Sequence, residues 1–365
     1  MAVDWSELSG DILLLILNKL FLLSDYHALS LVCKSWHFNA MQAWYQKDHP
    51  ELQLPLLMLP FDQTTNTCNF FNIRDREMLS LHLPELSNRY CCSSSQGWLI
   101  TVDENLDIHL LNPLTRSQVQ LPTHPFQSVY TDLSHPAGAV SFLKKAVLSS
   151  SPSSPSSSED CIILGLFGNI GRLSLCRVGE NTWNHITDSM VVIDHDYYFD
   201  VTYYNGEIYT VCEHGFFTSA INVFRFGQEK KEWFLMIQDR VEKVYFVESC
   251  GDLLLAVKPM HIYMFHVFKL DQKIDDWVEV EHLGDHSLFL GQNHGTSHLV
   301  DGDSSVISGN CIYFVDHYWD SYPCSKVYTF GVFNMEKKKA DINKLSIETS
   351  NAPPVWFQQL PMLDL

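Results

Sequence analysis

Residues 265–277 (FHVFKLDQKIDDW) combine a run of apolar and aromatic residues, a polar turn at Asp275-Asp276, and Trp277. The same order of strand, polar turn and tryptophan occurs twice earlier in the chain, ending at Trp183 and at Trp233. The three tryptophans follow one another at intervals of about 44–50 residues, which is the length of a four-stranded blade of a β-propeller. The repeat therefore predicts a ring of blades, with each tryptophan packed between two of them.

Short β-branched and aromatic runs that follow a turn with glycine predict further strands of these blades. They are residues 98–102, 208–211, 253–257 and 312–315. We expect each blade to hold a glycine-led inner strand, a middle strand, a polar hairpin and a tryptophan-bearing outer strand. Roughly 300 residues at this period predict six or seven blades. A β-sandwich, or two smaller β domains, stays open as the alternative.

A serine- and proline-rich segment, residues 149–159, interrupts this pattern. Such a composition cannot bury apolar surface, so we expect a mobile loop between strands. Ser151-Pro152 and Ser154-Pro155 are also candidate sites for a proline-directed kinase, although a plain spacer is the simpler interpretation.

Composition indicates a globular, intracellular chain. Hydrophobic residues make up 46% of the 365 residues and aromatic residues 13%. The formal net charge of −19 repels phosphate backbones, which argues against nucleic-acid binding. The same charge would speed encounter with a basic partner, or would simply aid solubility. Ten cysteines without a CxxC pair predict free buried thiols in a reducing compartment.

No membrane segment is expected at the N-terminus. The run Ile12–Leu17 is too short to cross a bilayer, and no small-residue cleavage site follows it. We therefore expect the protein in the cytoplasm, the nucleus or both, without a membrane partner.

Residues 1–46 differ from the rest and predict a small all-α module before the mainly β remainder, residues 47–365. Ser9 is a candidate N-cap, and Leu13, Ile16, Leu17 and Leu20 follow at helical spacing. A helix restarts at Ser24-Asp25, and an apolar stripe continues to Trp36. Some forty residues cannot bury this much apolar surface by themselves, so a partner chain or the rest of the protein should cover it.

The segments WSEL (5–8), DIL (11–13) and LVCKSW (31–36) resemble an F-box. The resemblance implies a three-helix unit that docks on a Skp-family adaptor and, through it, on a cullin-RING scaffold. The positions matching the contact residues of the motif are Leu8, Leu13, Ile16, Leu20, Val32, Cys33 and Trp36. Ser9 stands where the family usually has proline, so we expect weakened docking. An ordinary helical cap without a partner is the alternative.

The C-terminal part extends the resemblance over nearly the whole chain. Eight segments look like plant F-box proteins that carry the domain of unknown function 295, some of which are called Kelch-like: residues 244–249, 252–257, 267–270, 277–280, 283–285, 288–291, 310–314 and 353–357. This resemblance implies the non-catalytic substrate-recognition subunit of an SCF-type E3 ubiquitin ligase, with an unidentified protein target bound by the propeller.

Aromatic residues between predicted strands are candidates for target binding, because loops on a propeller face bind partners and Tyr and Trp are favoured anchors. Packing between blades explains them equally well. The candidates are Tyr197, Tyr198, Phe216, Tyr318 and Trp319.

Two other functions have weaker support. Asp194, Asp196 and Asp200 could belong to a glycosidase-like propeller hydrolase, but acidic turns explain them better, and no GxSxG, P-loop or HExxH motif occurs. An F-box scaffold unconnected to degradation is the other alternative. The pairs His282/His286 and His294/His298 have helical spacing, but intervening glycines break any helix, so we expect no metal and no cofactor.

Overall fold

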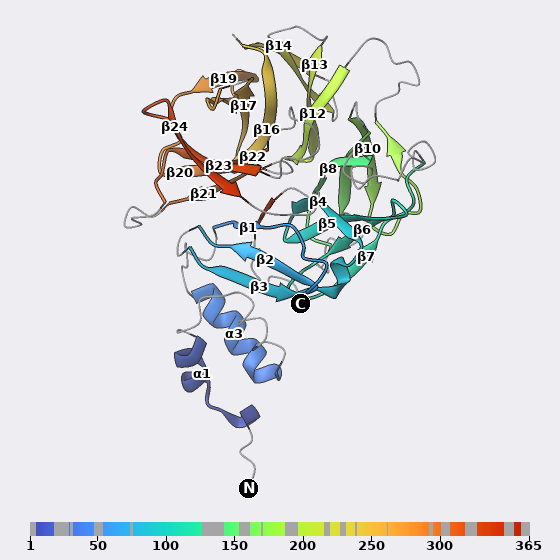
Figure 1. Ribbon diagram of the computed structural model, residues 1–365, viewed down its shortest axis with the longest axis vertical. Helices are drawn as coiled ribbons and strands as arrows, with labels where there is room; N and C mark the ends of the chain where they lie inside the picture. The colour runs from blue at the N-terminus through green and yellow to red at the C-terminus, as the bar shows by residue number, and fades with distance from the viewer. Residues whose placement is uncertain are drawn as a thin grey trace.

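The computed structural model shows a mainly β protein in which six sheets form a ring (Figure 1). It describes residues 5–17, 29, 32–46, 54–73, 76–125, 142–152, 161–168, 171–186, 196–214, 220–226, 231–237, 239–260, 262–291, 295–300, 307–317, 327–346 and 354–358. The ring is a six-bladed propeller, which confirms the predicted architecture, settles the blade number at six and excludes the sandwich.

The first three blades follow the chain in order, apart from one strand of blade 1. Blade 1 has the strand order β25-β1-β2-β3, and blades 2 and 3 contain β4–β7 and β8–β11. The bounds are β25 Val355–Phe357, β1 Leu56–Met58, β2 Thr67–Phe71, β3 Met78–His82, β4 Arg89–Ser95, β5 Trp98–Asp103, β6 Ile108–Leu111, β7 Gln118–Gln120, β8 Leu143–Leu148, β9 Ile162–Phe167, β10 Arg172–Arg177 and β11 Asn184–His185. The short 3-10 helix η3, Pro84–Leu86, connects blades 1 and 2.

Blades 4 and 5 are regular four-stranded antiparallel sheets, β12–β15 and β16–β19. Their bounds are β12 Asp196–Tyr204, β13 Glu207–His214, β14 Ala220–Phe226, β15 Lys231–Met236, β16 Val241–Ser249, β17 Asp252–Pro259, β18 His266–Asp271 and β19 Asp276–Val280. The stretch 265–277 therefore forms β18, a turn and the start of the outer strand β19, as predicted.

Blade 6 departs from the repeat. Its order is β21-β20-β22-β23-β24, and β20 pairs with β22 in parallel. The bounds are β20 His286–Leu290, β21 Gly295–Leu299, β22 Cys311–His317, β23 Val327–Asn334 and β24 Lys339–Ser346. A Cβ at Gly295 would lie 2.6 Å from Val247 Cγ2 and 2.9 Å from the Phe246 carbonyl oxygen, so β21 packs directly on β16.

The ring closes through the C-terminal strand. β25 pairs antiparallel with β1, with Trp356 opposite Leu57, so the two ends of the propeller share one sheet. Trp356 is 1% exposed, and its Nε1 donates to the Leu290 carbonyl of blade 6 at 3.0 Å. One side chain thus joins the first and last blades.

The predicted strand order within a blade needs one correction. The glycine-led strands β5, β13 and β17 are the second strands of their sheets, and an innermost strand precedes each of them. Two-residue hairpins join the innermost and second strands at Gln96-Gly97, Asn205-Gly206 and Cys250-Gly251, where both residues have positive φ. Glycine suits this tight turn. The turn joins the first and second strands of the blade, whereas the sequence pattern placed it before the first strand.

The three repeat tryptophans lie between blades, as predicted, but they do not all lie on the same face of their own blade. Trp183 packs in the cluster between blades 2 and 3, whereas Trp233 and Trp277 meet between blades 4 and 5 with ring centroids 6.3 Å apart. The interface of blades 3 and 4 contains no tryptophan among its described residues, and only five fully buried apolar residues form its core.

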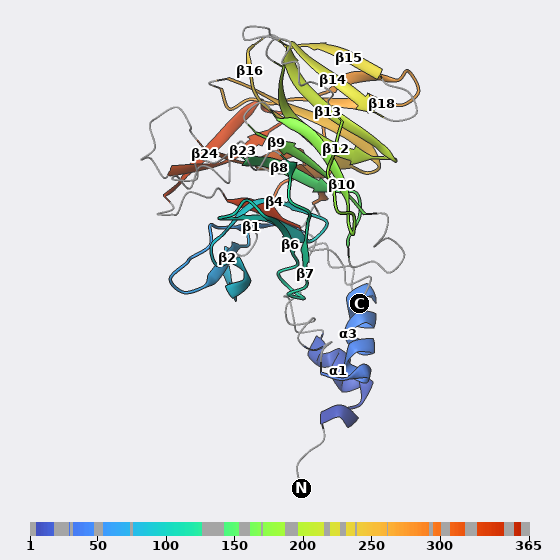
Figure 2. The same ribbon diagram turned by 90° about the vertical axis from the view of Figure 1, so that its right-hand side faces the viewer.

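The helices described within residues 5–46 lie outside the ring of blades in both views (Figures 1 and 2). They are the 3-10 turn η1, Trp5–Glu7, and the α-helices α1, Gly10–Leu17, and α3, Lys34–Gln46. Two α-helices are described in this part of the chain, and the expected third helix is not among the described elements.

Two smaller expectations are answered in part. The serine- and proline-rich segment connects β8 and β9, between strands as predicted, although residues 153–160 lie outside the described part. All cysteines in the described ranges are free thiols, most of them buried, and burial raises the pKa of Cys91 to about 12.

Ring closure can be tested with Trp356→Ala. Removing a fully buried indole at the joint should lower the free energy of unfolding by about 3–5 kcal/mol. Trp5→Ala is the matched control, because Trp5 is 62% exposed and should change stability by less than about 0.5 kcal/mol. Urea titration measures both, and equal effects of the two substitutions would refute closure through Trp356.

Candidate partner-binding surface on the N-terminal helices

Helix α1 begins directly after Ser9. The Ser9 carbonyl accepts hydrogen bonds from the Ile12 and Leu13 amides, each at 3.1 Å, so Ser9 occupies the N-cap position that the sequence predicted. Asp11 lies in the first turn, where its negative charge favours the positive end of the helix dipole.

One face of α1 packs on α3. Leu13 and Leu17 are each 1% exposed, as is Ala40 of α3. The helices approach closely at Gly10, where a Cβ would lie 2.9 Å from Asn39 Oδ1. Asn39 in turn donates from Nδ2 to the Ser35 carbonyl at 2.7 Å, which fixes its side chain within α3.

The opposite face of α1 is apolar and exposed. Ile12, Leu15 and Ile16 are 48%, 65% and 37% exposed and stand at i, i+3 and i+4, so they share one side of the helix. We call these three residues the α1 face. Covering each side chain fully would contribute roughly 1.5–3 kcal/mol, and within the described residues nothing covers them.

More exposed apolar side chains lie close by in the chain. Val32 precedes α3 and is 53% exposed, and Phe38 on α3 is 66% exposed. Trp36 is half-buried and donates from Nε1 to the Trp5 carbonyl at 3.0 Å, which ties η1 to α3. The helical module is therefore apolar inside and on part of its outside.

The residues expected to contact an adaptor differ in how exposed they are. Ile16 and Val32 are exposed, Leu8, Cys33 and Trp36 are half-buried, and Leu13 is buried against α3; Leu20 lies outside the described residues. Ile12, Leu15 and Phe38 are exposed residues that the candidate set omitted. The i, i+3, i+4 spacing of Ile12, Leu15 and Ile16 could have shown that these residues share one side of the helix. It could not show that this side is exposed, because packing on α3 decides which side of an apolar helix is buried.

The candidate target-binding aromatics are not brought together by the described structure. Tyr198 lies on β12 and packs, half-buried, at the interface of blades 3 and 4. Tyr197 lies on the same strand, but its side chain is not described, and Phe216, Tyr318 and Trp319 lie outside the described residues. Their role in target binding stays a prediction.

Polar side chains of the central strands link neighbouring blades. Ser94 Oγ on β4 donates to the Trp356 carbonyl of blade 1 at 2.5 Å, while Ser93 Oγ donates to the Ala146 carbonyl of blade 3 at 2.7 Å. Asp200 on β12 pairs with Lys145 of blade 3 and accepts the Phe246 amide of blade 5 at 2.7 Å.

The same series of contacts reaches blade 6. Asp316 on β22 pairs with Lys243 at 2.6 Å and with Lys258 at 2.7 Å, both from blade 5. We call Ser93, Ser94, Lys145, Asp200, Lys243, Lys258 and Asp316 the polar belt. Asp200, a candidate for the hydrolase hypothesis, is here an ion-paired link between three blades; Asp194 and the side chain of Asp196 are not described.

No group of three or more His, Cys, Asp or Glu side chains in the described ranges could hold a metal ion. Residues His282 and His286 lie before and at the start of β20, and His298 lies on β21, so the helical spacing of these histidines has no helical counterpart; His294 is not described. Neither described α-helix has the length and apolar character that a membrane crossing requires.

A family model described as the KIB1-4 beta-propeller matches residues 70–334, which run from β2 in blade 1 to the end of β23 in blade 6. The chain belongs to the KIB1-4 β-propeller family.

Its similarity to plant proteins extends beyond the propeller. "F-box protein At1g69090" from Arabidopsis thaliana is 24% identical over 397 residues, covering 97% of this chain and 91% of the relative. "Probable F-box protein At4g22165" from the same plant is 25% identical over 353 residues, covering 93% and 91%. "Putative F-box protein At4g22180", also from that plant, is 24% identical over 405 residues, covering 97% and 93%. At 97% coverage of this chain, the similarity to the first and third of these relatives includes the helical module as well as the blades.

Acid should weaken the polar belt at Asp316. Burial alone would raise the pKa of this carboxyl, but the charges of Lys243 and Lys258, with their hydrogen bonds, lower it to about 2. A carboxyl whose pKa is lower in the folded chain stabilises the fold above its unfolded pKa near 3.8 and loses that effect as pH falls towards 2.

Between pH 5 and pH 2, protonation of Asp316 should therefore remove about 2 kcal/mol from the free energy of unfolding. Asp316→Asn should be less stable at neutral pH, because Lys243 and Lys258 lose a partner, and its stability should fall less over this pH range. Urea titrations at several pH values measure both curves, and parallel curves would contradict the assignment.

Proposed function

We propose that this chain is the substrate-recognition subunit of an SCF-type cullin-RING E3 ubiquitin ligase, without catalysis of its own. The α1 face docks on a Skp-family adaptor, and the propeller holds a target protein near the ubiquitin-conjugating enzyme. Transfer is then promoted by effective concentration and positioning. The proposal places the protein in the cytoplasm, the nucleus or both.

The observation that carries the proposal is the exposed α1 face on a helix pair whose other side is already packed. Ile12, Leu15 and Ile16 leave an apolar strip uncovered, while Leu13 and Leu17 fill the contact with α3. An exposed apolar strip of this kind is typical of a helix that another chain covers. The F-box names of the relatives in Arabidopsis thaliana support the choice of partner.

Several finer points remain part of the proposal. They are the third helix of the F-box, the kinship with proteins bearing the domain of unknown function 295, the Kelch-like character of the repeat, and the module boundary at residue 46. Weaker docking because Ser9 replaces proline is another. The structure favours neither the hydrolase nor the scaffold alternative through a specific contact.

Adaptor capture tests the proposal. Co-expression of the full chain with a Skp-family adaptor should give a complex, and Leu15→Asp combined with Ile16→Asp should reduce capture at least about tenfold, because a carboxylate would be buried at the contact. Thermal stability should stay unchanged, since both side chains are already exposed.

Leu13→Asp is not an informative substitution, because Leu13 is buried against α3 and its loss would disturb the helix pair itself. Met78→Asp is the matched control, because Met78 is 51% exposed on the outer strand β3, away from the helices. Undiminished capture by the double variant would refute the docking face. Capture without any change in target abundance upon loss of the protein would favour the scaffold alternative.

A further inference from the structure

A second exposed apolar surface lies on the outer strand of blade 4. On β15, Phe234 is 64% exposed and Met236 is 71% exposed. The large apolar residues exposed on other outer strands occur singly and less openly: Met78 on β3, Val278 on β19 and Ile342 on β24, at 51%, 43% and 38%. β15 therefore stands apart among the described outer strands.

Alternation along β15 divides its side chains between two neighbours. Trp233 and Leu235 are buried in the cluster between blades 4 and 5. Glu232, Phe234 and Met236 must point the other way, towards blade 3, because successive side chains of a strand lie on opposite faces.

The surface continues across β14 on the same face. Phe224 pairs with Glu232 in register, and its ring stacks on Phe226 with centroids 6.3 Å apart. Phe226 packs at the edge of the cluster between blades 3 and 4. We call Phe224, Phe226, Glu232, Phe234 and Met236 the β15 face.

At its rim, the described part of blade 3 leaves Phe234 and Met236 exposed. Its outer strand β11 has two residues, whereas β15 has six. In addition, β15 pairs only with β14 among the described strands, so its other edge presents unpaired backbone N–H and C=O groups. A long edge strand with exposed apolar side chains is a template for another strand.

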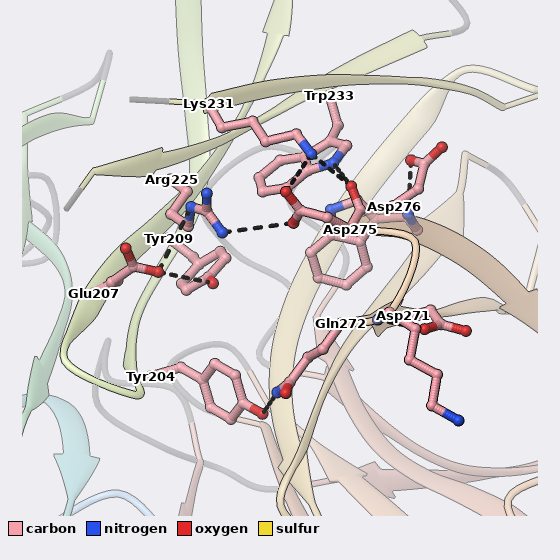
Figure 3. A network of polar contacts seen from close by, with 12 residues as sticks. Tyr204, Glu207, Tyr209, Arg225, Lys231, Trp233, Asp271, Gln272, Asp275 and Asp276 are labelled. Atoms are coloured by element: carbon pink, nitrogen blue, oxygen red, sulfur yellow. Dashed lines mark hydrogen bonds and ion pairs between the residues drawn. The ribbon is translucent and has the colours of Figure 1, made fainter. Parts of the chain in front are cut away.

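The charges around β15 favour a basic ligand. Both cations of the β14–β15 pair lie on the opposite face (Figure 3): Lys231 Nζ is 2.5 Å from Asp275 Oδ2, and Arg225 contacts Glu207 and Asp275 at 3.5 Å each. Among the described charged residues of these two strands, Glu232 alone is on the β15 face, and the whole chain carries a net charge of −19.

An unsatisfied acceptor lies beside Glu232. Asn222 pairs with Phe234 in register, and its Nδ2 donates to Glu232 Oε1 at 2.9 Å. Its Oδ1 is buried and has no hydrogen-bond partner within the described residues. A buried acceptor of this kind is costly unless a donor reaches it, and a ligand could supply one.

We propose that an extended segment of the target protein adds as a further strand to β15, with one basic and two apolar side chains at every second position, so that all three lie on the β15 face. Its apolar side chains lie on Phe234 and Met236, and a Lys or Arg side chain lies beside Glu232 and Asn222 Oδ1. The identification of this segment with a ubiquitination target rests on the proposed function, whereas strand addition itself does not.

Fluorescence anisotropy with the full chain and three labelled synthetic peptides tests the proposal. The basic peptide Thr-Lys-Thr-Val-Thr-Phe-Thr carries Lys, Val and Phe on one face and should bind, more weakly at higher salt. The acidic peptide Thr-Glu-Thr-Val-Thr-Phe-Thr should not bind, because its carboxylate would lie beside Glu232. Thr-Lys-Pro-Val-Pro-Phe-Thr should not bind, because proline lacks the N–H that strand pairing needs. Equal binding of all three peptides would overturn the proposal.

Variants locate the binding edge. Phe234→Ser with Met236→Ser should weaken binding of the basic peptide about tenfold. Glu232→Lys should shift preference towards the acidic peptide, and Met78→Ser on β3, the control, should leave binding unchanged.

Unchanged binding by the double variant would refute the site. A marked fall in its thermal stability would also refute it, because the chain itself would then cover the face. Adaptor capture through α1 should be normal in every variant, so failure here is distinguishable from failure of the proposed function.

Discussion

The pairing of β25 with β1 is the constraint on which the rest of the structure depends. Three residues from the C-terminal end, Val355–Phe357, complete the sheet that the first strand of the propeller begins. A ring closed in this way leaves no inner sheet edge open between its ends. It also means that the blades gain their full packing only when nearly the whole chain is present, since Trp356 contacts Leu290 of blade 6.

Once the ring is closed, the apolar side chains of the protein are either buried between blades or exposed outside the ring. Inside the ring, blade faces bury large side chains against each other, and the polar belt fixes the relative positions of the central strands through short contacts such as Lys243–Asp316. The helices precede the ring and take no part in its closure. Their exposed strip, Ile12, Leu15 and Ile16, is therefore available to another chain without any cost to the propeller. Phe234 and Met236 have the same property at the rim, where they lie exposed beside the short described strand β11.

Much of the ring was predictable from the sequence, because blade length and the tryptophan interval are local properties of the chain. Trp183, Trp233 and Trp277 all lie between blades, as the repeat predicted, and together they mark two interfaces. The sequence could not show that Trp233 faces the following blade while the other two face the preceding one. A shift of one residue in strand register reverses a side chain, and register is decided by pairing with distant strands. The parallel pairing of β20 with β22 escaped prediction for the same reason.

The exposed apolar surface of the helices was predictable in kind but not residue by residue. A helix that is apolar nearly all round has no sequence signal for its inner side, so Leu13 and Ile16 were grouped together although α3 buries the former and leaves the latter exposed. Gly10 and Asn39 decide that orientation through close contact. The aromatic candidates for target binding stay predictions: Tyr198 packs between blades, and aromatic composition alone does not distinguish packing from binding.

Hydrogen–deuterium exchange of the full chain, alone and with a Skp-family adaptor, tests the central claim most directly. We expect added protection in residues 10–17 and 32–46 when the adaptor is present. The amides of β1 and β25 should be equally protected in both states, because the ring closes without a partner. Protection that appears in the blades instead, or strong protection of residues 10–17 in the chain alone with no change on adding the adaptor, would contradict it.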